Sequence, residues 1–295
     1  MAKDDHYWLR EGQGIGPKCR WVFRLDGGLT SMGLARETAE VVIADETGAV
    51  QRLDRKGQLA VLTRMSGPAR LLDYCDSGEF GVLVVRNENL RRFDRDLKIE
   101  WKIDLPERIT AIAISPFGNQ MACSLADNST IVLNNRKKKI CRFETVRPLQ
   151  QLRFCHKEPL LIGATDDGFV CCHDLEGRQV WSEKMWNNIG ALDATGEGEM
   201  IFLAAFNQGI QALNGQGASL GAYVLEGTAR RLAASYEPHR LIVATTERFL
   251  YWLDADGELL WATGTPADIS HLACDPLGEW AICGFVNGDV LRLDW

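Results

Sequence analysis

The sequence has 295 residues, of which 46% are hydrophobic and 25% are charged, values that are ordinary for a globular protein with a sizeable core. The formal net charge is −7, which argues against general binding to nucleic acid or to anionic membranes, since both require a positive surface. No run of about 18 apolar residues is present, so we expect no membrane insertion.

The first residues and the cysteines indicate the cellular compartment of the protein. Met1 to His6 is polar and lacks the apolar stretch that a signal peptide needs. Nine cysteines occur without paired spacing, which is typical of a reducing environment rather than of a disulfide framework. Both features predict a cytoplasmic protein.

Residues 1–20 lie outside the repeat that fills the rest of the chain, and we interpret them as an N-terminal extension that is flexible or docked on a partner or another surface. Gly12, Gly14 and Gly16 alternate within it, but a phosphate-binding loop needs a strand before it and a helix after it, and neither is expected here. Tyr7 and Trp8 are candidate anchors, either for a partner or for the side of the folded part.

From Trp21 onward the sequence repeats every forty residues. The repeat is marked by an Asp or Asn that follows an apolar run: Asp54, Asp94, Asn134, Asp174, Asn214, Asp254 and Asp294. In four units a Gly follows three residues later, which predicts a β-turn with the acid or amide at its first place. We therefore interpret these acids as turn residues and not as catalytic groups.

Each unit of forty residues has room for four short strands. Its first strand has apolar residues two apart, for example Ile112 and Ile114, which is the period of a strand. Its second strand is apolar on both faces and reaches a mostly small residue, such as Ala44, as expected where sheets pack closely. A third strand precedes the marker Asp or Asn, and we expect the fourth to begin at positions such as Trp101, Trp181 and Trp261.

The two ends of the chain predict a closed ring. The chain stops at Trp295, so the seventh unit lacks a fourth strand. The position of that strand, carried back by seven periods, falls on Trp21, and Trp21–Leu25 resembles the segment that begins at Trp101. The N-terminal segment can thus supply the missing strand and remove the open edges. This predicts an all-β, seven-bladed propeller of four-stranded blades over residues 21–295.

The repeat resembles those of WD-repeat and quinoprotein-like propellers. The pattern Leu-Asp-x-x-Gly-x-x-x-Trp at 253–261, and a close relative at 174–181, is more similar to the quinoprotein type, because most third strands lack the Trp-Asp dipeptide of WD repeats. The resemblance implies a fold, and propellers host both enzymes and scaffolds.

We find no constellation of catalytic, metal-binding or cofactor-binding residues. Most cysteines fall in apolar strands, and the adjacent Cys171 and Cys172 alternate in direction along a strand, which disfavours a functional disulfide like that of quinoprotein dehydrogenases. No Cys-x-x-Cys or His-x-His spacing is present, so no metal is expected. His173 departs from the Leu or Phe of other units, and we expect a buried His with a hydrogen-bond partner.

These patterns favour a non-catalytic scaffold or accessory subunit that binds one or more proteins. The inter-blade loops are short, whereas propeller enzymes usually build their sites on long ones. Two alternatives remain, a quinoprotein-like enzyme and a propeller that binds a small ligand or peptide in its central channel. Our candidate contacts lie at one mouth of that channel, where innermost strands begin: Arg70, Arg230, Arg231 and His271.

Overall fold

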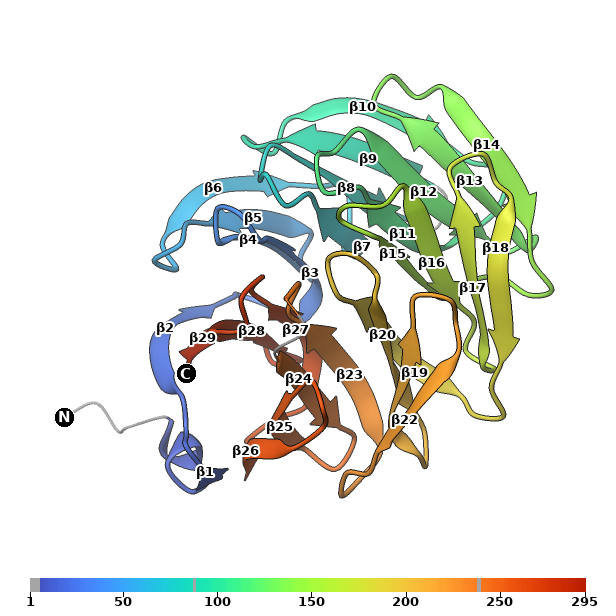
Figure 1. The fold of residues 1–295 in the computed structure, drawn as a ribbon. Coiled ribbons are helices and arrows are strands. Elements are labelled where there is room, and N and C mark those ends of the chain that lie inside the picture. The colour runs from blue at the N-terminus through green and yellow to red at the C-terminus, as the bar shows by residue number, and fades with distance from the viewer. Residues whose placement is uncertain (1–5, 87–88, 238–239) are drawn as a thin grey trace.

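The computed structural model, which describes residues 6–86, 89–237 and 240–295, is a ring of seven antiparallel sheets around a central channel (Figure 1). Each sheet has four blade strands, which follow the order of the chain in six of the seven sheets, and the innermost strands of neighbouring sheets contact one another around the channel. The predicted all-β propeller with seven blades is confirmed.

The blades follow the forty-residue units. Blade 1 consists of β3 (Leu29–Ala35), β4 (Glu40–Asp45), β5 (Ala49–Leu53) and β6 (Leu59–Arg64). Blade 2 consists of β7 (Ala69–Tyr74), β8 (Phe80–Val85), β9 (Asn89–Asp94) and β10 (Ile99–Asp104). Blade 3 consists of β11 (Ile109–Ile114), β12 (Gln120–Leu125), β13 (Ser129–Asn134) and β14 (Lys139–Glu144). Blade 4 consists of β15 (Gln151–Phe154), β16 (Leu160–Ala164), β17 (Phe169–Asp174) and β18 (Gln179–Lys184).

The other three blades complete the ring. Blade 5 consists of β19 (Ile189–Ala194), β20 (Met200–Ala205), β21 (Gly209–Asn214) and β22 (Ser219–Tyr223). Blade 6 consists of β23 (Ala229–Ala234), β24 (Arg240–Thr245), β25 (Phe249–Asp254) and β26 (Leu259–Gly264), and β1 (Gln13–Gly14) adds a fifth strand to its outer edge. Blade 7 consists of β27 (Ile269–Cys274), β28 (Trp280–Phe285), β29 (Asp289–Asp294) and, from the N-terminus, β2 (Lys18–Arg24). A single turn of 3-10 helix, η1 (Tyr7–Leu9), precedes β1.

The ring closes through β2, which pairs with β29 as the outer strand of blade 7 (Figure 1). The register matches Cys19 with Leu293 and Trp21 with Arg292, so the residue between Cys19 and Trp21 is bulged out of the pairing. The outer strands of the other blades carry the same irregularity, as between Ile99 and Trp101 of β10. The bulge explains why these strands begin two residues before the predicted position. The unpaired residue interrupts the two-residue strand period just before the Trp, so the sequence pattern marks only the part of the strand that follows it.

The marker residues are turn formers, as predicted. In blade 5, Asn214 Oδ1 accepts hydrogen bonds from the amides of Gln216 at 3.0 Å and Ala218 at 2.9 Å. In three of the four units the Gly three residues after the marker serves a second purpose, because it meets an aromatic ring of the preceding blade, whereas Gly177 meets Cys141. Gly217 has a φ of +83°, and a Cβ there would lie 2.5 Å from a ring atom of Trp181. The Trp181 indole in turn donates a hydrogen bond to the carbonyl of Gly215 at 2.9 Å.

The described part of the N-terminal extension, from His6 onward, lies against the side of the ring. Trp8 and Leu9 are buried in the core shared by blades 6 and 7, whereas Tyr7 is 60% exposed. The alternating glycines bring the chain onto the indole of Trp261: a Cβ on Gly12 would lie 2.3 Å from its Nε1, and one on Gly16 would lie 3.1 Å from the same atom. The glycines therefore allow close packing of the extension on blade 6.

Candidate functional site

Two faces of the disc follow from the topology. We call the face that carries the connections from each outer strand to the next inner strand the connection face, and the other the opposite face. The connections include 65–68, 105–108, 145–150, 185–188, 224–228 and 265–268. The turns between second and third strands lie on the connection face too, since the amide of Ile189 donates to the carbonyl of Asp166 at 2.9 Å.

The predicted channel-mouth residues lie on the connection face, but most of their polar groups tie blades together. The Arg231 guanidinium donates to the carbonyls of Ser270 at 2.7 Å and Gly190 at 3.2 Å, and so joins blades 5, 6 and 7. Arg70 donates to the carbonyl of Ile109 in blade 3. Burial is the main cause that lowers the pKa of Arg231, and the nearby positive charge of Arg230 lowers it further.

His271 lies beside these arginines and is partly buried. Its Nδ1 is 3.0 Å from the hydroxyl of Ser270. Burial is the main cause that lowers the pKa of His271 to about 4, and the positive charge of Arg231 is the smaller cause. The imidazole is therefore neutral at physiological pH, and Arg70 and Arg230 are the exposed residues among these four.

A buried ionic network at the other end of the inner strands was not predicted. It consists of two arginines, three aspartates, a histidine and a tyrosine from blades 1, 2, 4, 5 and 6: Arg36, Asp73, Asp76, Arg153, His156, Asp193 and Tyr236. All of these residues lie at or just beyond the ends of inner strands, so positions forty residues apart converge on the channel. We call this set the channel network.

The core of the channel network is an arginine pair held by aspartates. Arg153 Nε lies 2.9 Å from Asp193 Oδ1, and Arg36 lies 3.5 Å from Asp193 Oδ2 and 3.7 Å from Asp76 Oδ1. Burial alone would lower the pKa of Arg153, but Asp193 and the neighbouring anions outweigh it, so the net pKa is raised. Both guanidinium groups therefore stay charged.

Asp76 extends the network to two aromatic side chains. It accepts a hydrogen bond from the Tyr236 hydroxyl, and the His156 Nδ1 lies 3.3 Å from its Oδ2. The Arg36 guanidinium lies over the Tyr236 ring, 4.8 Å from its centroid. Burial, the largest cause, raises the pKa of the Tyr236 hydroxyl. The side chains satisfy one another and join five blades at the opposite face.

Trp186 is the most exposed large side chain of the connection face, at 92%. It lies in the connection between blades 4 and 5, on the border of two adjoining hollows of about 360 and 430 Å³. Val146 and Val224, in the connections before and after it, are 73% and 89% exposed. Four side-chain amides line the hollows: Asn187, Asn188, Asn207 and Gln208. We call Trp186, these four residues and the two valines the Trp186 surface.

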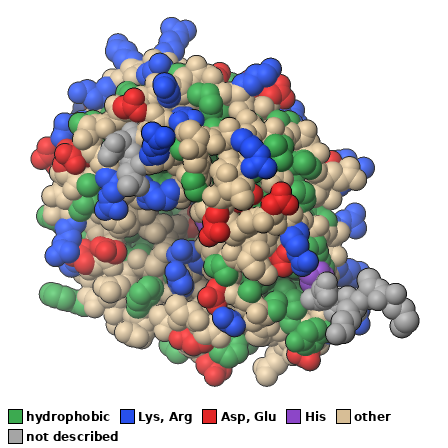
Figure 2. Space-filling model, turned by 180° about the vertical axis from the view of Figure 1, so that it is seen from behind, with side chains coloured by type: hydrophobic (Ala, Val, Ile, Leu, Met, Phe, Trp, Pro, Cys, Tyr) green, Lys and Arg blue, Asp and Glu red, His purple; other side chains and the backbone are tan. Residues whose placement is uncertain are grey.

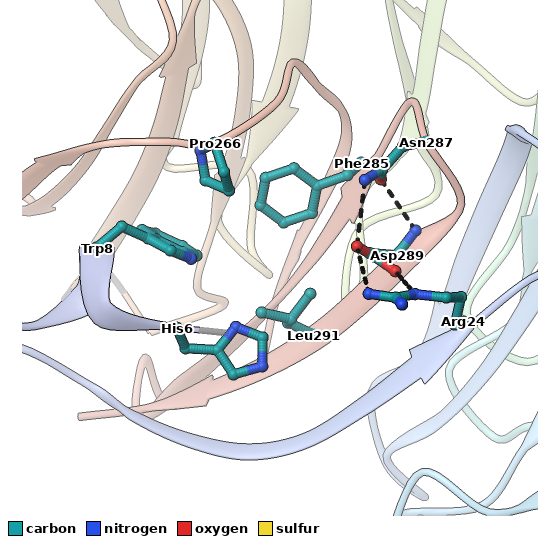
Figure 3. Close-up of a pocket in the computed structure, with 8 residues that line it drawn as sticks. All are labelled: His6, Trp8, Arg24, Pro266, Phe285, Asn287, Asp289 and Leu291. Carbon is teal, nitrogen blue, oxygen red and sulfur yellow. Dashed lines mark hydrogen bonds and ion pairs between the residues drawn. The ribbon is translucent and has the colours of Figure 1, made fainter. Parts of the chain in front are cut away.

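A smaller hollow of about 50 Å³ lies between the extension and blade 7 (Figure 3). Trp8, Pro266, Phe285 and Leu291 give it apolar walls, with His6 beside Leu291. At its rim the carboxylate of Asp289 accepts hydrogen bonds from Arg24 at 2.6 Å and Asn287 at 3.1 Å. Trp8 is engaged by its own chain here, because Thr263 donates to its carbonyl at 2.7 Å. Trp8 therefore packs against the side of the propeller itself.

The cysteines are free in the structure, and eight of the nine are buried. Burial raises the pKa of Cys171 and of Cys172 to about 12, so neither is a reactive thiolate. His173 is stacked on Phe143 of blade 3 at 3.8 Å, and its buried Nδ1 has no hydrogen-bond partner within the described part of the chain, contrary to our expectation.

The described residues offer neither a metal-binding cluster nor a membrane-spanning helix. In residues 6–86, 89–237 and 240–295, no three His, Cys, Asp or Glu side chains are grouped so that they could hold a metal ion. No helix in that part of the chain is long and apolar enough to cross a bilayer.

Comparison with known proteins adds no family. No family model matches the sequence, and no curated protein is significantly similar to it.

Proposed function

We propose that this propeller is a non-catalytic scaffold that binds another protein through the Trp186 surface. The observation that carries this proposal is the 92% exposure of Trp186 on the connection face. A tryptophan held in water exposes a large apolar area, and tryptophan is strongly enriched among the residues that dominate binding energy at protein interfaces. Val146 and Val224, exposed in the connections before and after it, add further apolar side chains to the same face.

The surrounding amides indicate the kind of partner. The side chains of Asn187, Asn188, Asn207 and Gln208 make no hydrogen bond to another described residue. An amide side chain offers a donor and an acceptor, which matches the groups of a polypeptide main chain. An extended protein segment with an apolar residue against Trp186 fits this chemistry. In this reading the chain is a subunit of a larger assembly.

The relation to quinoprotein-like repeats, rather than WD repeats, belongs to the same proposal. The Trp and Gly of the sequence pattern meet across blade boundaries, as for Trp181 and Gly217, and the same contact joins Trp21 to Gly57. A repeat defined by this contact supports the quinoprotein-like type of propeller without implying its enzymology.

The test is partner capture with matched variants. The tagged protein is purified gently from its native cytosol, and stoichiometric partners are identified by mass spectrometry. Trp186→Ser is expected to weaken the complex by at least tenfold. Leu220→Ser is the control, because Leu220 is 54% exposed but lies on the outer strand β22. Equal retention of the partner by both variants would overturn the proposal, as would a protein that carries a bound small molecule and no partner.

A further inference from the structure

We infer that blade 2 carries an oxyanion-binding pocket on the connection face, and that its ligand is a phosphoryl group. The pocket is a hollow of about 340 Å³ lined by Ser66, Arg86, Asn89, Arg91, Lys102 and Asp104. It shares no residue with the Trp186 surface, so it does not depend on the function proposed above.

The central residue of the pocket is Arg91, which is oriented without a carboxylate partner. Its Nε donates to the side-chain oxygen of Asn89 at 2.5 Å, and its Nη2 lies 3.3 Å from the hydroxyl of Ser66. The amide of Asn89 is fixed in turn, because it donates to Asp104. The acceptors of Arg91 are therefore neutral, and its positive charge is not compensated by them.

Two further cations border the same hollow. Arg86 and Lys102 are exposed, and neither forms an ion pair with a described residue. Counting only residues that the structure describes, the pocket gathers three positive charges and one carboxylate, Asp104, which the Asn89 amide already engages. This excess of positive charge stands out on a chain whose net charge is −7. In Figure 2, Lys and Arg side chains gather along the top and the upper left, where the reversed view places blades 2 and 3.

The arrangement favours a tetrahedral dianion. A guanidinium binds two oxygens of a phosphate or carboxylate side by side, and additional cations favour the group with the larger charge. A hydroxyl such as that of Ser66 and the ammonium of Lys102 can donate to the remaining oxygens. A phosphoryl group can accept from these cations through the donors that the protein does not already use, since Nε and Nη2 of Arg91 are engaged by Asn89 and Ser66. A single carboxylate leaves part of the positive charge uncompensated.

The experiment uses the full chain and three probes in titration calorimetry at low salt: inorganic phosphate, a short neutral peptide with one phosphoserine, and the same peptide with unmodified serine. Binding of phosphate and of the phosphopeptide, with none by the serine peptide, is the expected result. A phosphopeptide at least tenfold tighter than inorganic phosphate assigns the pocket to a modified protein segment. Similar affinities assign it to a free phosphorylated metabolite or ion, and both results support the site.

Variants locate the binding. Arg86→Gln with Lys102→Gln removes two exposed charges and is expected to weaken phosphate binding at least tenfold, and Arg91→Met is expected to abolish it. Arg136→Gln with Lys138→Gln is the control, because it removes the same charge from an exposed turn between β13 and β14. Thermal unfolding of each variant shows that the fold is kept. No binding by the wild-type protein, or an equal loss in the control, would overturn the inference.

Discussion

Arg153 and Asp193 form an ion pair at 2.9 Å that joins the inner strands of blades 4 and 5 inside the channel. The same Asp193 accepts hydrogen bonds from the amides of Ala194 and Ala234, each at 3.0 Å, so one carboxylate connects three blades. Asp73 repeats this device, with bonds from Tyr74 and from Ile114 of the next blade at 2.9 Å. The channel network therefore fixes the spacing of blades at the opposite face.

Removing the carboxylate of Asp193 should destabilise the protein strongly. In Asp193→Ala, Arg36 and Arg153 lose their shared partner while they remain buried, and such a change typically costs about 3–5 kcal/mol. The free energy of unfolding from denaturant titration measures it. Asp268→Ala is the control, because its pair with Arg248 has both side chains about half exposed and should contribute less than about 1 kcal/mol. Similar losses in the two variants would contradict a structural role for the network.

The contact between Gly217 and Trp181 predicts that a second substitution will lower the stability of the protein. Gly217→Ala places a Cβ within the indole and strains a left-handed backbone, so we expect a loss of about 2–4 kcal/mol in the free energy of unfolding. Gly264→Ala is the control, because no atom lies within 4 Å of its added Cβ. A Gly217→Ala variant as stable as Gly264→Ala would show that the Trp-to-Gly contact is not specific.

The docking of the extension predicts a difference between neighbouring aromatic residues. Trp8→Ala removes the buried anchor, so the extension should detach and trypsin should cleave after Arg10 and Lys18 at least tenfold faster than in the wild type. Tyr7→Ala should leave the rate unchanged, because Tyr7 is 60% exposed. Cleavage rates followed by intact-mass spectrometry decide between these outcomes, and equal rates in the two variants would show that Trp8 does not hold the extension.

His173 predicts a loss of stability in mild acid. Burial lowers its pKa from 6.5 to about 4. Between these values the unfolded chain binds more protons than the folded one, so the free energy of unfolding falls as the pH drops, by about 2 kcal/mol between pH 7 and pH 5 for this group. His173→Leu, the residue type of most other blades, should lessen the fall by that amount. Parallel stability curves for wild type and variant would contradict the assignment.

The repeat predicted the architecture because its markers have local causes. A turn Asp such as Asp54 and a strand period of two act within a few residues, and the ring then follows from the number of units and from Trp21. The bulges were not predicted, because the residue left unpaired in a bulge has no characteristic amino-acid type that would mark it in the sequence.

The channel network was missed for a geometric reason. Equivalent positions on separate blades lie far apart in the outer turns but not in the inner strands, where a shared axis brings them together. A signal was present: Asp73, Arg153 and Asp193 occupy the position that is Ala113 in blade 3 and Ala233 in blade 6. The Trp186 surface and the blade 2 pocket depend on loop conformation and side-chain exposure, which periodicity does not encode.

The pairing of β2 with β29 also has a consequence for how the chain acquires its shape on the ribosome. Lys18 faces Asp294, so β2 meets its partner only after the six blades that lie between them in the sequence have been made. Blades 1 to 6 have all their blade strands in sequence and can form in turn, while β2 remains unpaired. The pairing of β2 with β29, rather than the completion of any single blade, is then the step that closes the ring.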